Sequence, residues 1–124
     1  GIELSEIEVS KEIQDASALG RGYAIAGGVA EAVKKTALTI DPSREINVEG
    51  ASTLQECVKL MRVAKAGKKN GYLLEGMACL GGCIAGPGTI ASFNRVRKAV
   101  LEFKNQAECK SPLDNETIDE KLKK

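Results

Sequence analysis

Two of the four cysteines, Cys79 and Cys83, lie close together in a glycine-rich stretch that reads CLGGC. Gly81 and Gly82 between them carry no side chains and can adopt unusual dihedrals, so a tight loop can point both sulfurs at one object. The N–H groups of such a loop can also turn inward and form a nest for negative charge. An anionic iron–sulfur cluster with thiolate ligands would suit this arrangement.

Three simpler interpretations compete with a cluster site. The two thiols could be incidental to a structural turn. They could form a redox disulfide, although their spacing differs from the thioredoxin-like Cys-x-x-Cys. They could also supply half of a zinc site, which generally needs four ligands. On spacing alone, a metal or cluster site ranks slightly above the turn.

The other two cysteines are poorly placed to act as ligands. Cys57 falls on the apolar face of a predicted helix, where free cysteine behaves as a small hydrophobe, and Cys109 lies in a polar tail. Because an iron–sulfur cluster usually has four cysteine ligands, the missing thiolates would lie outside these 124 residues. The chain starts "GIELSEIEV" without Met, so we interpret it as a piece of a longer protein; a complete small protein with a trimmed tag is the alternative.

The composition excludes several classes of function. The absence of His rules out His-containing zinc sites and Ser-His-Asp or Cys-His catalysis. A net charge of +1 gives no electrostatic case for binding nucleic acid or an anionic membrane surface. No stretch approaches the ~20 apolar residues of a membrane helix. Without a visible secretory signal, the chain is expected to be cytoplasmic and its thiols reduced.

The hydrophobic periodicity predicts strands alternating with helices. Thr53 and Glu56 form a capping box that starts the clearest helix. The order of elements predicts an α/β fold of βαβα type, with a small, mostly parallel sheet flanked by helices. The expected elements are a helix at about 28–38, a strand at 46–50, a helix at 53–66, a strand at 72–78 and a helix at 89–105.

The two cysteines lie where sites form in open parallel sheets. Such sites lie beyond the carboxyl ends of the strands, and the predicted bend at 79–88 follows a strand directly. The last helix, expected to begin near Thr89, would direct its positive N-terminal end at the bend. Its core side is predicted to consist of Ile90, Phe93, Val96, Val100 and Phe103.

The residues around the bend resemble a known signature. "EGMACLGGCIAGPG", which starts at Glu75, resembles the third cysteine signature of the iron-only (FeFe) hydrogenases, Glu-x-Met-Ala-Cys-x-Gly-Gly-Cys before a glycine-rich run. "YAIAGGVAEAV", at 23–33, looks like the family's aromatic-x-x-x-Gly-Gly-Val segment that opens a helix. The resemblance covers roughly residues 1–107 as the C-terminal lobe of the catalytic domain. It leaves 108–124 as a polar, flexible tail.

The resemblance implies roles for individual residues. Cys79 would ligate the 4Fe-4S half of the active-site cluster, and Cys83 would bridge that half to a di-iron unit where protons and electrons become dihydrogen. Small residues would allow the backbone to approach the cofactor closely. For Met77 and the glycine pair, ordinary packing in a strand and at a helix start is the alternative. The implied cofactor-binding residues are Ala26, Gly27, Gly28 and Met77.

The chain departs from the best-known pattern at two places. Leu80 stands where Pro is common. Pro87-Gly88-Thr89-Ile90 stands where the well-studied members have further glycines followed by Gln-Pro. In this respect the chain is more similar to a less-characterised branch of the family. The resemblance implies a fragment of a hydrogenase that exchanges electrons with a carrier such as ferredoxin. Alternatives are a hydrogenase-like iron–sulfur protein in cluster assembly or hydrogen sensing, and a metal-free α/β interaction domain.

The fragment alone is expected to lack both the cluster and activity, because its ligand set is incomplete. Its partner would be the remainder of the same catalytic domain. That part would dock on an exposed apolar face, which would also favour self-association of the isolated chain.

Overall fold

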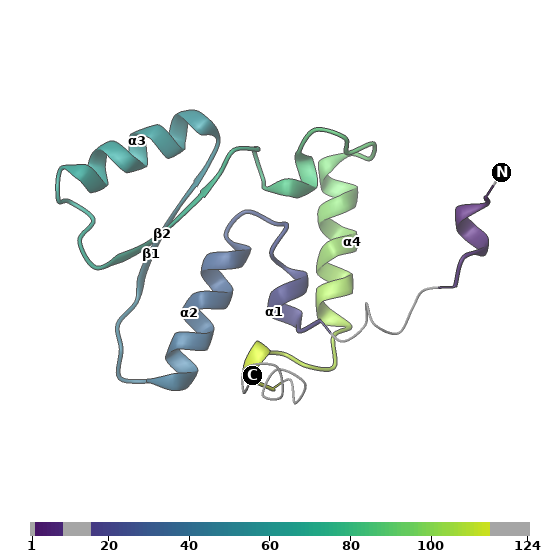
Figure 1. Ribbon diagram of the computed structural model, residues 1–124, viewed down its shortest axis with the longest axis horizontal. Coiled ribbons are helices and arrows are strands. Elements are labelled where there is room, and N and C mark those ends of the chain that lie inside the picture. The colour runs from purple at the N-terminus through teal and green to yellow at the C-terminus, as the bar shows by residue number, and fades with distance from the viewer. Residues whose placement is uncertain (1, 9–15, 115–124) are drawn as a thin grey trace.

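The computed structural model describes residues 2–8 and 16–114, which form an α/β arrangement (Figure 1). Helix α3 lies on one side of a two-stranded sheet, and α2, α1 and α4 follow one another on the other. The helices are α1 (Ala18–Arg21), α2 (Gly28–Ile40), α3 (Leu54–Lys65) and α4 (Phe93–Asn105); the strands are β1 (Asn47–Ser52) and β2 (Tyr72–Met77), and short 3-10 turns span Leu4–Glu6, Cys83–Ala85 and Pro112–Asp114.

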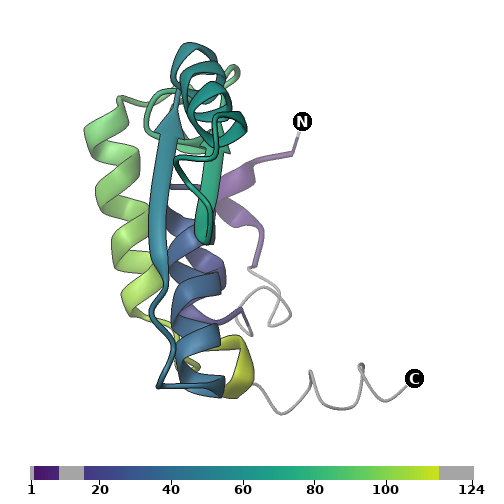
Figure 2. The same ribbon diagram turned by 90° about the vertical axis from the view of Figure 1, so that its left-hand side faces the viewer.

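The sheet consists of β1 and β2, which pair in parallel. The register runs from Asn47 opposite Tyr72 to Ser52 opposite Met77, and α3 forms the crossover between the strands. Figure 2 shows the two strands side by side, with α4 along one edge of the molecule. The predicted parallel pairing is confirmed, and both carboxyl ends lie at the same edge, where the cysteines follow.

The capping box predicted for α3 is present in a shifted form, because the Glu56 carboxylate bonds the residue before the N-cap Thr53. The Thr53 hydroxyl accepts a hydrogen bond from the Glu56 N–H at 3.1 Å, and the Glu56 carboxylate accepts one from the Ser52 N–H at 2.9 Å. On the inner face of this helix, the Cys57 sulfur lies 3.6 Å from the Met77 carbonyl oxygen. A Cβ built at Gly76 would lie 3.1 Å from the same sulfur, so Cys57 fills the space between α3 and the strand ends.

The last helix begins later than the sequence predicts. Helix α4 starts at Phe93, and the expectation of a start near Thr89 is wrong. The Thr89 N–H and hydroxyl both donate to the Gly86 carbonyl, at 3.2 and 2.8 Å, which closes a turn instead of opening a helix. Gly88, with φ of 89°, stands in this turn. Ile90 is therefore fully exposed and not on the core side.

Helix α4 packs on α1 through a shallow contact. Arg21 of α1 donates from Nη1 to the Phe103 carbonyl at 2.9 Å, and its guanidinium lies 4.2 Å from the centre of the Phe103 ring. No residue of α4 is buried; Phe93 and Phe103 are each 40% exposed, and Val96 and Val100 are half-buried. The predicted core face of this helix is thus only partly covered by the described residues.

Small aliphatic side chains make up most of the core, including Ala18, Ala30, Ala32 and Ala107. The segment after α4 returns to α1, where the Ala18 N–H donates to the Cys109 carbonyl at 2.8 Å. The domain boundary at 107 stays a prediction, and residues 1, 9–15 and 115–124 lie outside the described part. Within the described ranges, no helix has the length and apolar character needed to cross a membrane.

Candidate functional site

Cys79 and Cys83 lie in one tight loop after β2, the cysteine loop (residues 79–86). The Gly82 N–H donates to the Cys79 carbonyl at 3.0 Å, and the Gly86 N–H donates to the Cys83 carbonyl at 3.1 Å. Both thiols are free; Cys79 is half-buried and Cys83 is exposed. The predicted bend is therefore present, and it holds the two sulfurs on a short stretch of fixed backbone.

The two glycines between the cysteines are required by the surroundings as well as by the dihedrals. Gly81 and Gly82 have φ of 83° and 98°, a region that side chains disfavour. A Cβ at Gly81 would lie 2.4 Å from the Phe93 ring, and one at Gly82 would lie 2.5 Å from the Ala24 carbonyl oxygen. The loop thus packs directly against α4 on one side and against the segment before α2 on the other.

The chain enters α2 through Ala26, Gly27 and Gly28, the glycine wall (residues 26–28), whose last residue is the first of the helix. The Ala26 N–H donates to the Gly81 carbonyl at 3.0 Å, and Ile25 forms an antiparallel bridge with Gly82. The structure therefore places the glycine wall beside the cysteine loop, although some fifty residues separate them in the sequence.

Close packing explains the glycine at position 28, and a positive φ explains the one at position 27. A Cβ at Gly28 would lie 2.0 Å from the Gly22 carbonyl oxygen, so no larger residue fits. Gly27 is the N-cap of α2 with φ of 89° and provides no side-chain cap. Met77, the fourth predicted cofactor contact, ends β2 opposite Ser52 and is half-buried.

Sequence reasoning missed Glu75 as a structural contact of this site. Its carboxylate accepts hydrogen bonds from the backbone N–H groups of Gly27 at 2.5 Å and of Val29 and Ala30 at 3.0 Å each. A signal was available, because α2 begins at a Gly-Gly pair and has no Ser, Thr, Asp or Asn to cap it. A carboxylate from another element then becomes the expected partner.

Ser52 is the second missed residue. Its hydroxyl accepts a hydrogen bond from the Gly81 N–H at 2.7 Å and donates one to the Cys79 carbonyl at 3.2 Å. The hydroxyl thereby bonds the backbone on both sides of Leu80. No local sequence pattern identifies this contact. Ser52 directly precedes the N-cap Thr53, so the sequence indicates only a role at the start of α3.

The potential metal ligands of this site suit part of an iron–sulfur cluster. Among residues 2–8 and 16–114, no group of three or more His, Cys, Asp or Glu side chains could hold a metal ion. Cys57 faces the strand ends, and the Cys109 thiol donates to the Ser111 carbonyl at 2.9 Å. The soft thiols of Cys79 and Cys83 are the ligand type of iron–sulfur clusters, and Cys83 is exposed. The residues present therefore fit two of four thiolate positions.

Comparison with known families agrees with this geometry. The family described as iron only hydrogenase large subunit, C-terminal domain, matches residues 1–87 of the 124-residue chain. The chain belongs to this family. The hydrogenase match includes the glycine wall, both strands and the two cysteines of the loop, and it ends before α4. None of the curated proteins compared with the chain matches it.

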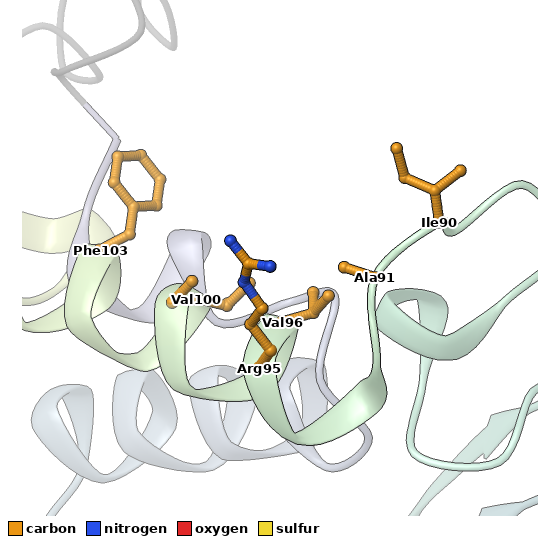
Figure 3. A pocket seen from close by; sticks show the side chains of 7 residues that line it. Ile90, Ala91, Arg95, Val96, Val100 and Phe103 are labelled. Carbon is orange, nitrogen blue, oxygen red and sulfur yellow. The ribbon is translucent and has the colours of Figure 1, made fainter.

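An open apolar groove of about 630 Å³ runs along α4 (Figure 3). Figure 3 shows Ile90 and Ala91 at one end, Phe103 at the other, and the Arg95 guanidinium standing beside the apolar side chains. The groove lies beyond the residues that the hydrogenase family matches. Its lining consists of Ile90, Ala91, Arg95, Val96, Ala99, Val100 and Phe103.

Proposed function

We propose that this chain is one lobe of the catalytic domain of an iron-only hydrogenase and supplies two of the cysteine ligands of its active-site cluster. The observation that supports this most strongly is the pairing of the cysteine loop with the glycine wall. Two soft ligands on one hydrogen-bonded loop, beside a Gly27 whose Cβ position is open, are what a large inorganic group needs on one side. When bound, the 4Fe-4S cluster and di-iron unit supply the interconversion of protons plus electrons and dihydrogen.

The two cysteines have different proposed roles, which come from the resemblance, and they differ in exposure. Cys79 is half-buried beside Gly86 and would be a ligand of the 4Fe-4S part. Cys83 is exposed and would bridge to the di-iron unit. Ala26, Gly27 and Gly28 would form the close wall of the pocket, and the thioether of Met77 would pack near the di-iron unit.

The site needs a second protein part to be complete. We propose that the remainder of the catalytic domain supplies the other ligands and covers the groove on α4, whose exposed side chains are mostly apolar. In isolation the chain would then be inactive, free of a stable cluster and prone to self-association. Ferredoxin as electron carrier and a cytoplasmic location remain proposals on the same basis.

A hydrogenase-like protein without hydrogenase activity is the second candidate. The turn at Gly86–Thr89 departs from the signature, because Pro87-Gly88-Thr89-Ile90 stands in place of further glycines and Gln-Pro, and Thr89 bonds back to Gly86. This difference lies directly after the cysteine loop. It would suit a relative in cluster assembly, whose pocket would hold no di-iron unit, or a hydrogen-sensing relative.

The substitution Cys83→Ser in the full-length parent tests the proposed role. Hydrogen evolution should fall at least about tenfold, because a hydroxyl is a poor substitute for a bridging thiolate. Cys109→Ser is the matched control and should leave activity unchanged. Equal activity of the Cys83 variant and the wild type would refute the bridging role. Wild-type parent with a stable 4Fe-4S cluster but no hydrogen evolution would favour the second candidate.

A second experiment tests whether the site is split. The 124-residue chain is reconstituted anaerobically with iron and sulfide, and bound iron is measured after desalting. We expect no stoichiometric, stable 4Fe-4S cluster, since the described part holds two suitable thiols. A stable cluster on this chain would show that the ligand set is complete within it.

A further inference from the structure

Glu75 joins the strand that leads to Cys79 with the start of α2. Its Oε2 accepts a hydrogen bond from the Gly27 N–H at 2.5 Å, and its Oε1 accepts bonds from the Val29 and Ala30 N–H groups at 3.0 Å each. The donors lie 45 to 48 residues earlier in the chain. Both carboxylate oxygens are therefore engaged with the backbone next to the glycine wall.

Helix α2 depends on this distant carboxylate for its cap. The first N–H groups of a helix have no partner within the helix, and a side chain at the N-cap normally accepts one of them. Here the N-cap is Gly27, which has a positive φ and no side chain, so the helix has no local side-chain cap. The negative charge of Glu75 also matches the positive end of the helix.

The same contact fixes the distance between wall and loop. Glu75 lies in β2, and the chain continues through Met77 to Cys79. The loop also bonds the segment before α2 directly, from the Ala26 N–H to the Gly81 carbonyl at 3.0 Å and from the Ile84 N–H to the Ala24 carbonyl at 3.3 Å. Those bonds hold residues 24–26, whereas Glu75 holds Gly27 and the first turn of α2 against the strand that leads to Cys79.

We propose that Glu75 is a positioning residue of the cofactor site, which holds the glycine wall at a fixed place relative to Cys79 before the cofactor binds. The inference rests on the proposed function, because it concerns the same pocket. Glu75 is assigned no ligand role, since its two oxygens accept three backbone hydrogen bonds. Its action on the cofactor is through the backbone that it orders.

The first test measures amide hydrogen exchange in the 124-residue chain with Glu75→Gln. Gln keeps the side-chain length, but it loses the charge and turns an NH2 donor toward a backbone N–H group. Exchange at Gly27, Val29 and Ala30 should become about tenfold faster, and exchange in α3 should stay as in the wild type. Glu102→Gln is the matched control. Glu102 is exposed, and its carboxylate oxygen lies 3.8 Å from the Lys98 Nζ, a weak surface ion pair.

The second test uses the full-length parent with its cofactor and follows loss of iron to a chelator. Iron should be lost about tenfold faster from the Glu75→Gln variant than from the wild type, as for other residues that orient metal ligands. Glu75→Asp keeps the negative charge on a shorter side chain. This variant should lose iron more slowly than Glu75→Gln but faster than the wild type. The Glu102→Gln control should lose iron at the wild-type rate.

The outcomes separate this inference from the proposed function. Wild-type parent without stoichiometric iron would overturn the proposed function, and the inference with it. Iron-loaded wild type with equal iron loss from the Glu75→Gln variant would overturn the inference alone. Unchanged exchange at Gly27, Val29 and Ala30, or faster exchange at every amide of the chain, would also overturn it, because Glu75 would then order nothing locally.

Discussion

Ser52 holds the turn at Gly81 from the end of the neighbouring strand, with its hydroxyl oxygen 2.7 Å from the Gly81 nitrogen. The same hydroxyl donates to the Cys79 carbonyl, so a single side chain bonds both arms of the turn. Since Ser52 also pairs with Met77 in the sheet, the two strand ends and the cysteine loop form one hydrogen-bonded unit.

Removal of this hydroxyl should weaken the loop. Ser52→Ala leaves the Gly81 N–H without its partner, and we expect the free energy of unfolding to fall by about 1 to 3 kcal/mol. Urea unfolding of the chain measures the change. Ser92→Ala is the control, because Ser92 is the N-cap of α4 and makes no side-chain cap bond. A similar loss for both variants would contradict the assigned role of Ser52.

The dihedrals of the cysteine loop should make it intolerant of side chains. Gly82→Ala introduces a Cβ at φ of 98° and 2.5 Å from the Ala24 carbonyl oxygen, and should cost about 2 kcal/mol or more. Gly50→Ala, in β1, meets no atom within 4 Å and should be neutral or slightly stabilising. Thermal unfolding of the two variants compares them directly, and equal midpoints would count against this account.

Glu31 should make stability depend on pH in the acid range. Hydrogen bonds from Lys104, at 2.8 Å, and Lys35, at 2.6 Å, hold the pKa of Glu31 below its ordinary value of 4.5. Because the pKa is lower in the folded state, the contribution is present above the unfolded pKa and is lost as pH falls through the folded pKa.

The expected size is small because the carboxylate is partly exposed. Solvent screening limits the contribution to about 0.5 kcal/mol. The free energy of unfolding is measured with urea at about pH 6 and about pH 3, on either side of the carboxylate pKa range. Between these two values it should fall further for the wild type than for Glu31→Gln. Parallel pH curves for the two proteins would exclude this role, and Glu102→Gln should follow the wild type.

The elements whose signals are local could be predicted from the sequence. The capping box at Thr53 and Glu56 and the apolar face of α3 defined that helix, and the order of elements predicted the parallel pairing of β1 and β2. The start of α4 could not be predicted from the spacing of apolar residues. That spacing does not show that Thr89 bonds back to Gly86 and forms a turn. Ile90 continues the apolar pattern of the helix but lies between that turn and the start of α4.

The candidate site divides in the same way. Cys79 and Cys83 were identified because they share one short loop, and the resemblance added the glycine wall. Glu75 and Ser52 were missed as contacts because their partners lie far away in sequence or in another element. Their side chains have no unusual spacing, and only the packed arrangement shows what they bond.

The distance in sequence between Glu75 and its partners has a consequence for folding order. On the ribosome, Gly27 and Val29 emerge more than forty residues before the carboxylate that caps them. The first N–H groups of α2 must then stay bonded to water until the chain through β2 has been synthesised and β2 has paired with β1. That pairing brings Glu75 into place. Cys79 and Cys83 emerge after Glu75, so the carboxylate that caps α2 has left the ribosome before either thiol can meet a cofactor.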